Sequence, residues 1–273
     1  MYKKLLSYAW LAVIVLIAIP YTLTAESDTP IAGQIWKEPV TGMEFIWVPG
    51  GCYQMGCGDW TSDCYRDEKP AHEVCLDSFW MGKTEVTQGQ WKQVMGENPS
   101  EFEKGDNYPF ENALFEEMEQ FITKLSSSTT DAYKFRFPTE AEWEYACRSG
   151  GKPEKYAGGS DIDRVAWYQG NSGRSTQPVA TKAPNGLGLF DMNGNVNEWC
   201  ADTYRGWAYG KHERNNPLFR DEGYTKVYRG GSWNSKVKYA RCAARSYEIG
   251  IESYTKFRAY RNNDLGFRLV RNK

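Results

Sequence analysis

Histidine is nearly absent from this chain: His72 and His212 are the only two among 273 residues. Two imidazoles cannot supply a three-histidine iron or zinc centre within one chain. A Ser-His-Asp arrangement would need one of them, and neither lies in a recognisable catalytic motif. We expect His72, in the stretch 69–73, to be a strand residue whose side chain bonds to the backbone.

A large excess of charge of one sign is also lacking. Lysine and arginine number 33 against 35 aspartate and glutamate residues, for a formal net charge of -2. Without a strongly basic balance, the sequence predicts no nucleic-acid partner. No Gly-x-Gly pattern follows an expected strand and opens a helix, so nucleotide binding is not indicated either.

The sequence is instead rich in aromatic residues and glycine, with 11 Trp, 18 Tyr and 26 Gly. Large flat side chains together with many glycines are typical of an irregular domain of short strands and long ordered loops. The length allows a sizeable core. No linker, charge block or internal repeat interrupts the chain beyond residue 42. We therefore expect one domain over residues 38–271, preceded by a short polar tether over 26–37.

Three helices are expected in the first half of the domain. Thr87 should cap the first, which stops at Gly96. Asn112 should cap the second, which carries apolar residues at helical spacing between 115 and 125. Thr139 opens the third with a capping box. Three alternating glutamates predict a solvated acidic face on that helix: Glu140, Glu142 and Glu144. Short strands and glycine turns follow from residue 151, so the fold class is α+β.

The N-terminal segment is typical of a targeting sequence. Lys3 and Lys4 precede an apolar run of about 19 residues, and Ala25 offers a small residue for cleavage. A secretory signal peptide over 1–25 explains this pattern. An uncleaved anchor is the alternative, because the run is just long enough to span a bilayer. Both predict export to a periplasmic or extracellular space, with membrane contact only through an uncleaved N-terminal segment.

Export changes how the seven cysteines are interpreted, because an oxidising compartment favours disulfides. Four of them form a local group: Cys52, Cys57, Cys64 and Cys75. Two local disulfides are expected there, and three connectivities are open. A zinc site is the alternative, although the group lacks a paired Cys-x-x-Cys.

Several sequence blocks resemble those of one known family. They are GKTEVT at 82–87, FPTEAEWEYAC at 137–147, GLGLFDMNGNV at 186–196, RGGSWNS at 229–235, RCAARS at 241–246 and GFRLV at 266–270. In this order they resemble the formylglycine-generating enzyme, or sulfatase-modifying factor, family. The resemblance covers about 230 residues and implies a variant of the C-type lectin fold, an α+β domain poor in regular structure.

The resemblance does not extend to the copper site of the named enzymes. Their two copper-binding cysteines follow the Gly-Gly-Ser turn, whereas here Ser235 stands at the first position and no cysteine follows before Cys242. Copper(I) selects soft thiolates, and a serine hydroxyl cannot replace them. Copper, and formylglycine generation itself, are therefore not expected.

The remaining cysteines are interpreted through the same resemblance. It implies a disulfide between Cys147 and Cys242. The second structural disulfide of the family is missing, because Leu269 stands where its C-terminal cysteine would be. Cys200 is then the odd cysteine. We expect a small buried residue beside Trp199, and a reactive or metal-binding thiol is the alternative.

The loop at 191–198 is a candidate calcium site. It places several oxygen-bearing side chains around a glycine, as hard cations require. The resemblance implies the side chains of Asp191 and Glu198 as ligands, with the carbonyls of Gly194 and Val196. A plain Asn-Gly turn is the alternative. Asn197 departs from the family, which usually has tryptophan at this position.

The glycine turn at 230–231 is expected to line a binding pocket, because the equivalent turn of the family lines its substrate-peptide site. The candidate lining residues are Ser232, Trp233, Asn234, Ser235 and Arg245. The alternative is that these polar residues only satisfy backbone groups of the turn.

Two functions follow from these observations. The first is an exported calcium-bearing module that binds a peptide, a glycan or an envelope protein through the Ser232–Ser235 surface. The second is an oxidoreductase that modifies a peptide or peptide-derived metabolite with oxygen, as family members without the cysteine pair do. The missing copper cysteines and the abundant aromatic residues favour the first.

Overall fold

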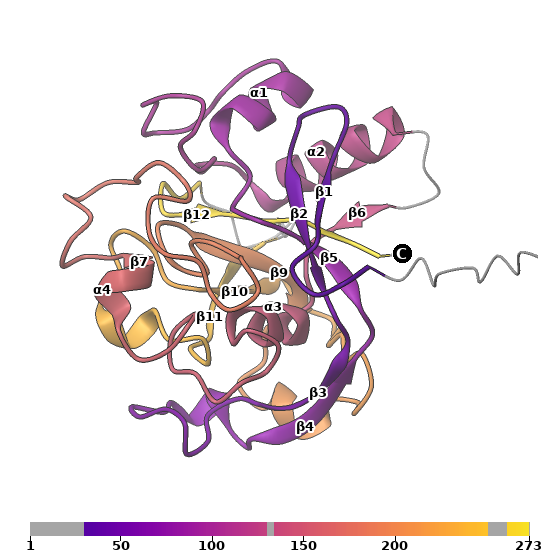
Figure 1. Ribbon diagram of the computed structural model, residues 1–273, viewed down its shortest axis with the longest axis vertical. Helices are drawn as coiled ribbons and strands as arrows, with labels where there is room; N and C mark the ends of the chain where they lie inside the picture. The colour runs from indigo at the N-terminus through magenta and orange to yellow at the C-terminus, as the bar shows by residue number, and fades with distance from the viewer. Residues whose placement is uncertain (1–29, 130–133, 251–260, 273) are drawn as a thin grey trace, which may run out of the picture.

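The computed structural model describes residues 30–129, 134–250 and 261–272 (Figure 1). The predicted signal peptide or anchor at 1–25 lies outside the described residues. Within them, no helix is long and apolar enough to cross a membrane. The predicted tether is wrong at its end, because Ile35–Lys37 forms strand β1 and pairs with β2. The folded domain therefore begins before residue 38.

Two sheets organise the molecule. The five-stranded sheet has the order β1-β2-β5-β13-β6, and all its pairs are antiparallel. Its strands are β1 (Ile35–Lys37), β2 (Glu44–Val48), β5 (Phe79–Gly82), β13 (Val270–Arg271) and β6 (Phe135–Arg136). The second sheet has the order β11-β10-β9-β12, with β12 parallel to β9. Its strands are β9 (Asn197–Thr203), β10 (Thr225–Arg229), β11 (Ser246–Ile249) and β12 (Leu265–Gly266). The strands β12 and β13 thus connect the C-terminal segment to both sheets.

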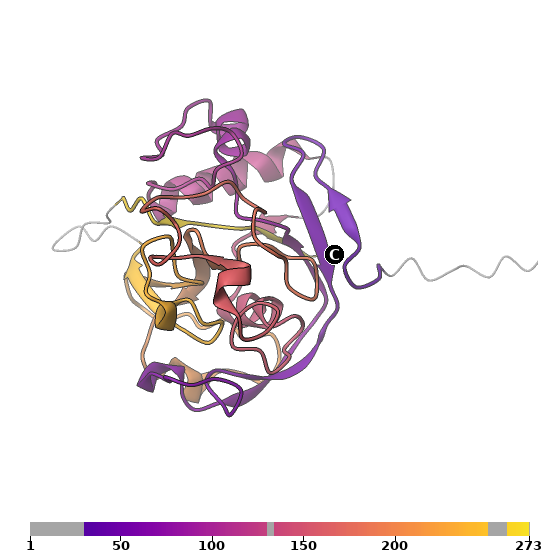
Figure 2. The ribbon, with the colours of Figure 1, turned by 60° about the vertical axis from the view of Figure 1, so that its left-hand side comes forward.

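Smaller elements complete the fold. A hairpin pairs β3 (Gly51–Met55) with β4 (His72–Leu76), and a short parallel pair joins β7 (Ala166–Trp167) to β8 (Asn193–Gly194). The helices are α1 (Gln88–Met95), α2 (Phe115–Ser128), α3 (Glu140–Cys147) and α4 (Ile162–Val165). Single 3-10 turns are η1 (Arg66–Glu68), η2 (Ala208–Lys211) and η3 (Val237–Tyr239). The helices α1 and α2 and the β3–β4 hairpin lie at opposite ends of the molecule, with α3 between them (Figure 1, Figure 2).

The helix starts show where capping signals were sufficient. Thr87 and Thr139 accept the N3 backbone N–H of α1 and α3, and Gly96 ends α1 in the left-handed region, as predicted. The prediction that Asn112 caps α2 is wrong. That helix begins at Phe115, and Glu117 accepts the backbone N–H of Leu114 at 2.8 Å. The glutamate alone supplies the local cap.

The disulfide predictions are confirmed. Three bridges form: Cys147–Cys242, Cys52–Cys75 and Cys57–Cys64. Cys52 and Cys75 are directly opposite each other in the β3–β4 hairpin, and this register selects their pairing. Cys200 is unpaired and fully buried on β9, as expected of a small core residue.

The predicted acidic face of α3 is wrong, because all three glutamates are buried and paired with arginine. Glu140 accepts two bonds from Arg245, at 2.6 and 2.8 Å. Glu142 accepts both guanidinium ends of Arg136, at 2.7 and 2.6 Å. Three glutamates on a short helix resemble a solvated face until the fold packs arginines against them, from nearby in the sequence for Arg136 and from 105 residues away for Arg245.

Glu144 belongs to the same network and has no exposed atoms. It pairs with Arg229 of β10 at 2.5 Å and with Arg148 at 3.1 Å. The Arg229 guanidinium also lies 3.3 Å from Glu140, so it bridges two carboxylates of α3. Charges removed from water in this way are tolerable only when each has a partner.

We therefore expect Arg229→Met, which keeps the aliphatic stem, to lower the free energy of unfolding by about 3–5 kcal/mol, because it leaves Glu144 buried with one cation fewer. The measurement is urea unfolding of the oxidised protein, followed by circular dichroism. The control is Lys83→Met at the partly exposed pair with Glu44, where a change of about 0.5 kcal/mol is expected. Equal losses in the two variants would contradict this account.

Candidate functional site

The predicted binding turn begins where β10 ends. Gly230 and Gly231 follow with φ of 94° and 73°, a conformation that glycine adopts without strain. A side chain at Gly231 would also meet the Cα of Ala240 at 3.0 Å. The two glycines therefore reverse the chain in a confined space and present residues 232–235.

The turn is closed by hydroxyl groups around a carboxylate. Ser232 Oγ donates to Asp264 Oδ2 at 2.9 Å, and the backbone N–H of Ser232 donates to Ser235 Oγ at 2.9 Å. Asn197 Nδ2 donates to the same Asp264 oxygen at 3.3 Å. Asp264 is a site residue that sequence reasoning missed. It precedes the GFRLV block without a motif of its own, so only the fold brings it to the turn.

The outer part of the turn is accessible. Trp233 donates its ring N–H to the carbonyl of Asn263 at 3.1 Å and meets the ring of Phe102 edge to face, with centroids 5.3 Å apart. Asn234 is exposed. Beyond the turn, Val237 and Tyr239 are 39% and 40% exposed. Ser232 itself is fully buried. Residues 233–239 combine hydrogen-bonding groups with apolar side chains that contact solvent, and we call them the turn surface.

A second buried carboxylate holds the loop that carries Phe102. Glu111 accepts the backbone N–H groups of Glu101 and Phe102 at 3.1 and 2.9 Å. Burial raises the pKa of Glu111 to about 7, although these two bonds lower it. Burial likewise raises the pKa of Asp264. The turn surface therefore adjoins acids whose ionised forms are costly.

Arg245 does not join the other predicted pocket residues. It is buried, pairs with Glu140, and donates to the carbonyl of Asp67 at 2.8 Å. Its guanidinium lies 4.2 Å from the ring centre of Tyr209. The structure thus assigns Arg245 to the ion network of α3, while Ser232, Trp233, Asn234 and Ser235 stay together on the turn.

The predicted calcium loop fits a cation in part. Asp191 accepts the backbone N–H of Ala180 through Oδ2 at 2.7 Å, and its buried Oδ1 has no partner. Glu198 is committed elsewhere: both its oxygens accept bonds from Arg268, at 2.6 and 2.7 Å, and one also accepts the ring N–H of Trp143. Asp191 therefore retains an unpartnered oxygen for a metal, whereas Glu198 accepts two bonds at Oε2 and one at Oε1.

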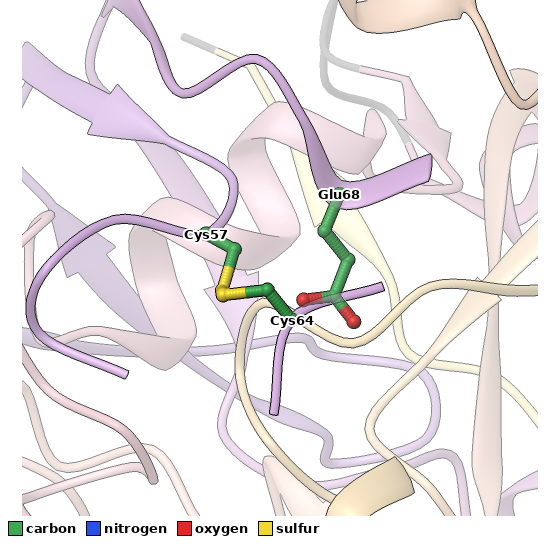
Figure 3. A group of neighbouring side chains, drawn as sticks. All are labelled: Cys57, Cys64 and Glu68. Atoms are coloured by element: carbon green, nitrogen blue, oxygen red, sulfur yellow. A yellow bond between two sulfur atoms is a disulfide. The ribbon is translucent and has the colours of Figure 1, made fainter. Parts of the chain in front are cut away.

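Two clusters of potential metal-ligating side chains occur among the described residues: Cys57 with Cys64 and Glu68, and Glu140 with Asp202 and His212. In the first, the cysteines are joined to each other (Figure 3). Its carboxylate forms two bonds to Arg241, at 2.9 and 2.6 Å. Because disulfide sulfurs are not thiolates, this cluster is structural.

Comparisons with known proteins agree with this fold. The family model described as sulfatase-modifying factor enzyme 1-like domain matches residues 32–273. A chaperone protein LppX of Paenibacillus barcinonensis is 31% identical over 282 residues, 84% of this chain and 90% of the relative. The formylglycine-generating enzyme of Bos taurus is 28% identical, over 84% of this chain and 75% of the relative.

Solved structures are similar along nearly the whole chain. Treponema denticola variable protein 1 superposes with a TM-score of 0.75 at 29% identity, covering 90% of this chain and all of that one. PvdO from Pseudomonas aeruginosa superposes with a TM-score of 0.79 at 23% identity over 90% of this chain and 100% of that one, a likeness of fold. The predicted fold, an α+β variant of the C-type lectin fold, is confirmed.

The Glu111 carboxyl predicts a pH dependence. Its pKa in the folded protein is about 7, above the ordinary value of 4.5. The folded state therefore binds more protons between these values, and its stability falls as pH rises from about 4.5 to about 7. Glu111→Gln should remove a part of this fall on the order of 2 kcal/mol. Urea unfolding across this range measures it, with exposed Glu103→Gln as the control. Parallel stability curves for wild type and Glu111→Gln would refute the assignment.

Proposed function

The chain belongs to the family of sulfatase-modifying factor enzyme 1-like domains, and on that premise we propose that it is a binding module for exposed polypeptide segments. The observation that carries the proposal is the state of the cysteines. Six of the seven are joined in disulfides, and Cys200 is buried alone. The pair of thiolates that copper(I) would require cannot form from one remaining thiol.

The chemistry of the turn surface supports a peptide as the occupant. The exposed amide of Asn234 can exchange hydrogen bonds with a backbone, while Val237 and Tyr239 offer apolar contact. Interfaces commonly place aromatic anchors beside a polar rim in this way. The surface also carries Lys236 and Lys238, both exposed, which favour a segment without excess positive charge.

The relatives support the same choice. One relative that matches most of this chain is named a chaperone protein. A chaperone-like module would bind unfolded segments of other exported proteins, which is the peptide or envelope-protein alternative of the sequence analysis. Relatives named formylglycine-generating enzyme support the oxidoreductase alternative, but the turn here carries serine in place of the copper-binding cysteines. No relative reported above favours the glycan alternative.

The proposed location is outside the cytoplasm. Three disulfides within one chain are typical of proteins that fold in an oxidising compartment. The N-terminal pattern of two lysines followed by an apolar run is typical of a secretory signal and also supports export. Whether the space is periplasmic or extracellular does not affect the chemistry of the turn.

Calcium remains part of the proposal in a revised form. The unpartnered Oδ1 of Asp191, together with the carbonyls of Gly194 and Val196, would hold the ion. Glu198 would contribute through its bonds to Arg268 and Trp143, which hold β9 in place beside the loop. The ion would neutralise buried negative charge and stiffen the loop.

The binding proposal predicts that the chain binds an unfolded protein but not its native form. The probe is reduced, carboxymethylated lysozyme carrying a fluorophore, followed by anisotropy. Trp233→Ala should weaken binding about tenfold, because it removes an aromatic anchor from the surface. The matched control is Trp207→Ala, a 56% exposed tryptophan outside the turn, which should change the affinity less than about twofold.

Because Trp233 also supports the turn, exposed Asn234→Arg serves as a second variant that blocks the surface without removing a ring. Wild-type protein that fails to bind the unfolded probe would refute the function. Equal affinities in Trp233→Ala, Asn234→Arg and the control would place binding elsewhere on the molecule.

The metal proposal predicts about one calcium per chain and no stoichiometric copper in protein of residues 26–273 purified without chelators. Asp191→Asn should lose the calcium, because an amide oxygen is a weaker ligand than a carboxylate. Elemental analysis of both proteins measures this. Stoichiometric copper would revive the oxidoreductase alternative, and calcium retained by Asp191→Asn would move the site.

A further inference from the structure

The only two histidines of the chain meet in the folded protein. His72 begins β4, and His212 follows η2, 140 residues later. His72 Nε2 lies 3.1 Å from His212 Nδ1, and His72 Nδ1 lies 3.0 Å from the carbonyl oxygen of Pro70. The segment of η2 lies beside the β3–β4 hairpin (Figure 1).

This chain of bonds determines the tautomers. A carbonyl oxygen can only accept, so Nδ1 of His72 carries the hydrogen. In a neutral ring the other nitrogen, Nε2, then accepts, and the bond must come from Nδ1–H of His212. Neutral His212 is therefore left with an unprotonated Nε2 whose lone pair points away from His72.

That nitrogen is buried and has no hydrogen-bond partner. Ligand atoms of His212, Asp202 and Glu140 nevertheless lie within 4.8 Å of one another. A protonated Nε2 would be expected to approach a carboxylate to hydrogen-bond distance. Instead, Nε2 of His212 forms no hydrogen bond with either carboxylate. A cation bound between the three side chains would coordinate all of them.

The charges around these three residues also favour a bound cation. Asp202 is 1% exposed and accepts the backbone N–H groups of Glu140 and Phe219, at 2.7 and 2.8 Å, but forms no ion pair with the described residues. Glu140 is already paired with Arg245 and Arg229. The electrostatic gain from a cation therefore comes mainly from Asp202 and the lone pair of His212.

We propose that His212, Asp202 and Glu140 form a binding site for a zinc-like divalent transition ion, independent of the turn surface and of the calcium loop. His212 binds through Nε2, and each carboxylate contributes one oxygen. Oε1 of Glu140 already accepts bonds from Arg245 and from the Tyr209 hydroxyl. Oε2 of Glu140 and each oxygen of Asp202 accept one bond, so each of these keeps a lone pair for the metal. Hard cations prefer sites made only of oxygen, whereas zinc readily accepts imidazole with carboxylates.

The surroundings match the support that metal ligands usually have. A ligating histidine commonly donates its second N–H to a neighbouring group that fixes the ring, and His72 accepts that bond here. Arg245 and two backbone N–H groups orient the carboxylates. The bound ion would join the half-buried His212 segment to α3 and β9.

The test is zinc titration of untagged, oxidised protein against a chromophoric chelator at pH 7.5. The expected result is one tight site per chain. His212→Phe keeps a ring but removes the lone pair and should lower the affinity by roughly 100-fold or more. His72→Ala should lower it by about 10–100-fold through loss of the supporting bond. Exposed Glu213→Gln is the control and should change nothing.

Near-UV circular dichroism checks that each variant is folded. Absence of zinc binding by the wild type, or unchanged affinity in folded His212→Phe, would overturn the proposal. Cobalt substitution supplies a second readout: a spectrum without sulfur-to-metal charge transfer is expected, and a thiolate band would assign the metal to Cys200 instead. If His212→Phe loses zinc binding but still binds unfolded lysozyme, the zinc site and the binding function are separate.

Discussion

The structure depends on arginine–glutamate pairs that are buried almost completely. Arg229 joins β10 to two carboxylates of α3, Arg268 holds Glu198 of β9, and Arg241 holds Glu68 beside the Cys57–Cys64 bridge. Removing such charges from water costs several kcal/mol per ion, and only accurate pairing offsets that cost. Each pair joins segments distant in sequence, so the irregular loops between them have few alternative arrangements.

The same pairs position the functional surfaces. Arg229 is the last residue of β10, directly before the glycines that reverse the chain, so the anchor of the core is also the anchor of the turn surface. Glu198 follows Asn197, which holds Asp264 under Ser232. Glu198 accepts bonds from Arg268 and Trp143, so the residue predicted as a calcium ligand also holds β9 against the core.

The state of the cysteines limits the chemistry that this domain can perform. Six cysteines are joined in three disulfides that hold the loops together. The turn itself carries no cysteine and offers the hydroxyl groups of Ser232 and Ser235. In the proposed function, such a turn would bind a peptide through hydrogen bonds and apolar contact. The proposed function thus places a recognition surface on this fold, without the pair of thiolates that a copper site requires.

The sequence alone determined the features that depend on neighbours along the chain or on family motifs. Capping boxes located α1 and α3, and motif position identified the Cys147–Cys242 bridge. Only the tertiary structure decided which charged residues are buried. Arg229 pairs with Glu144 from 85 residues away, Arg245 pairs with Glu140 from 105, and His72 meets His212 across 140. No local pattern encodes such pairs, because whether a carboxylate is solvated or buried depends on what the fold packs against it.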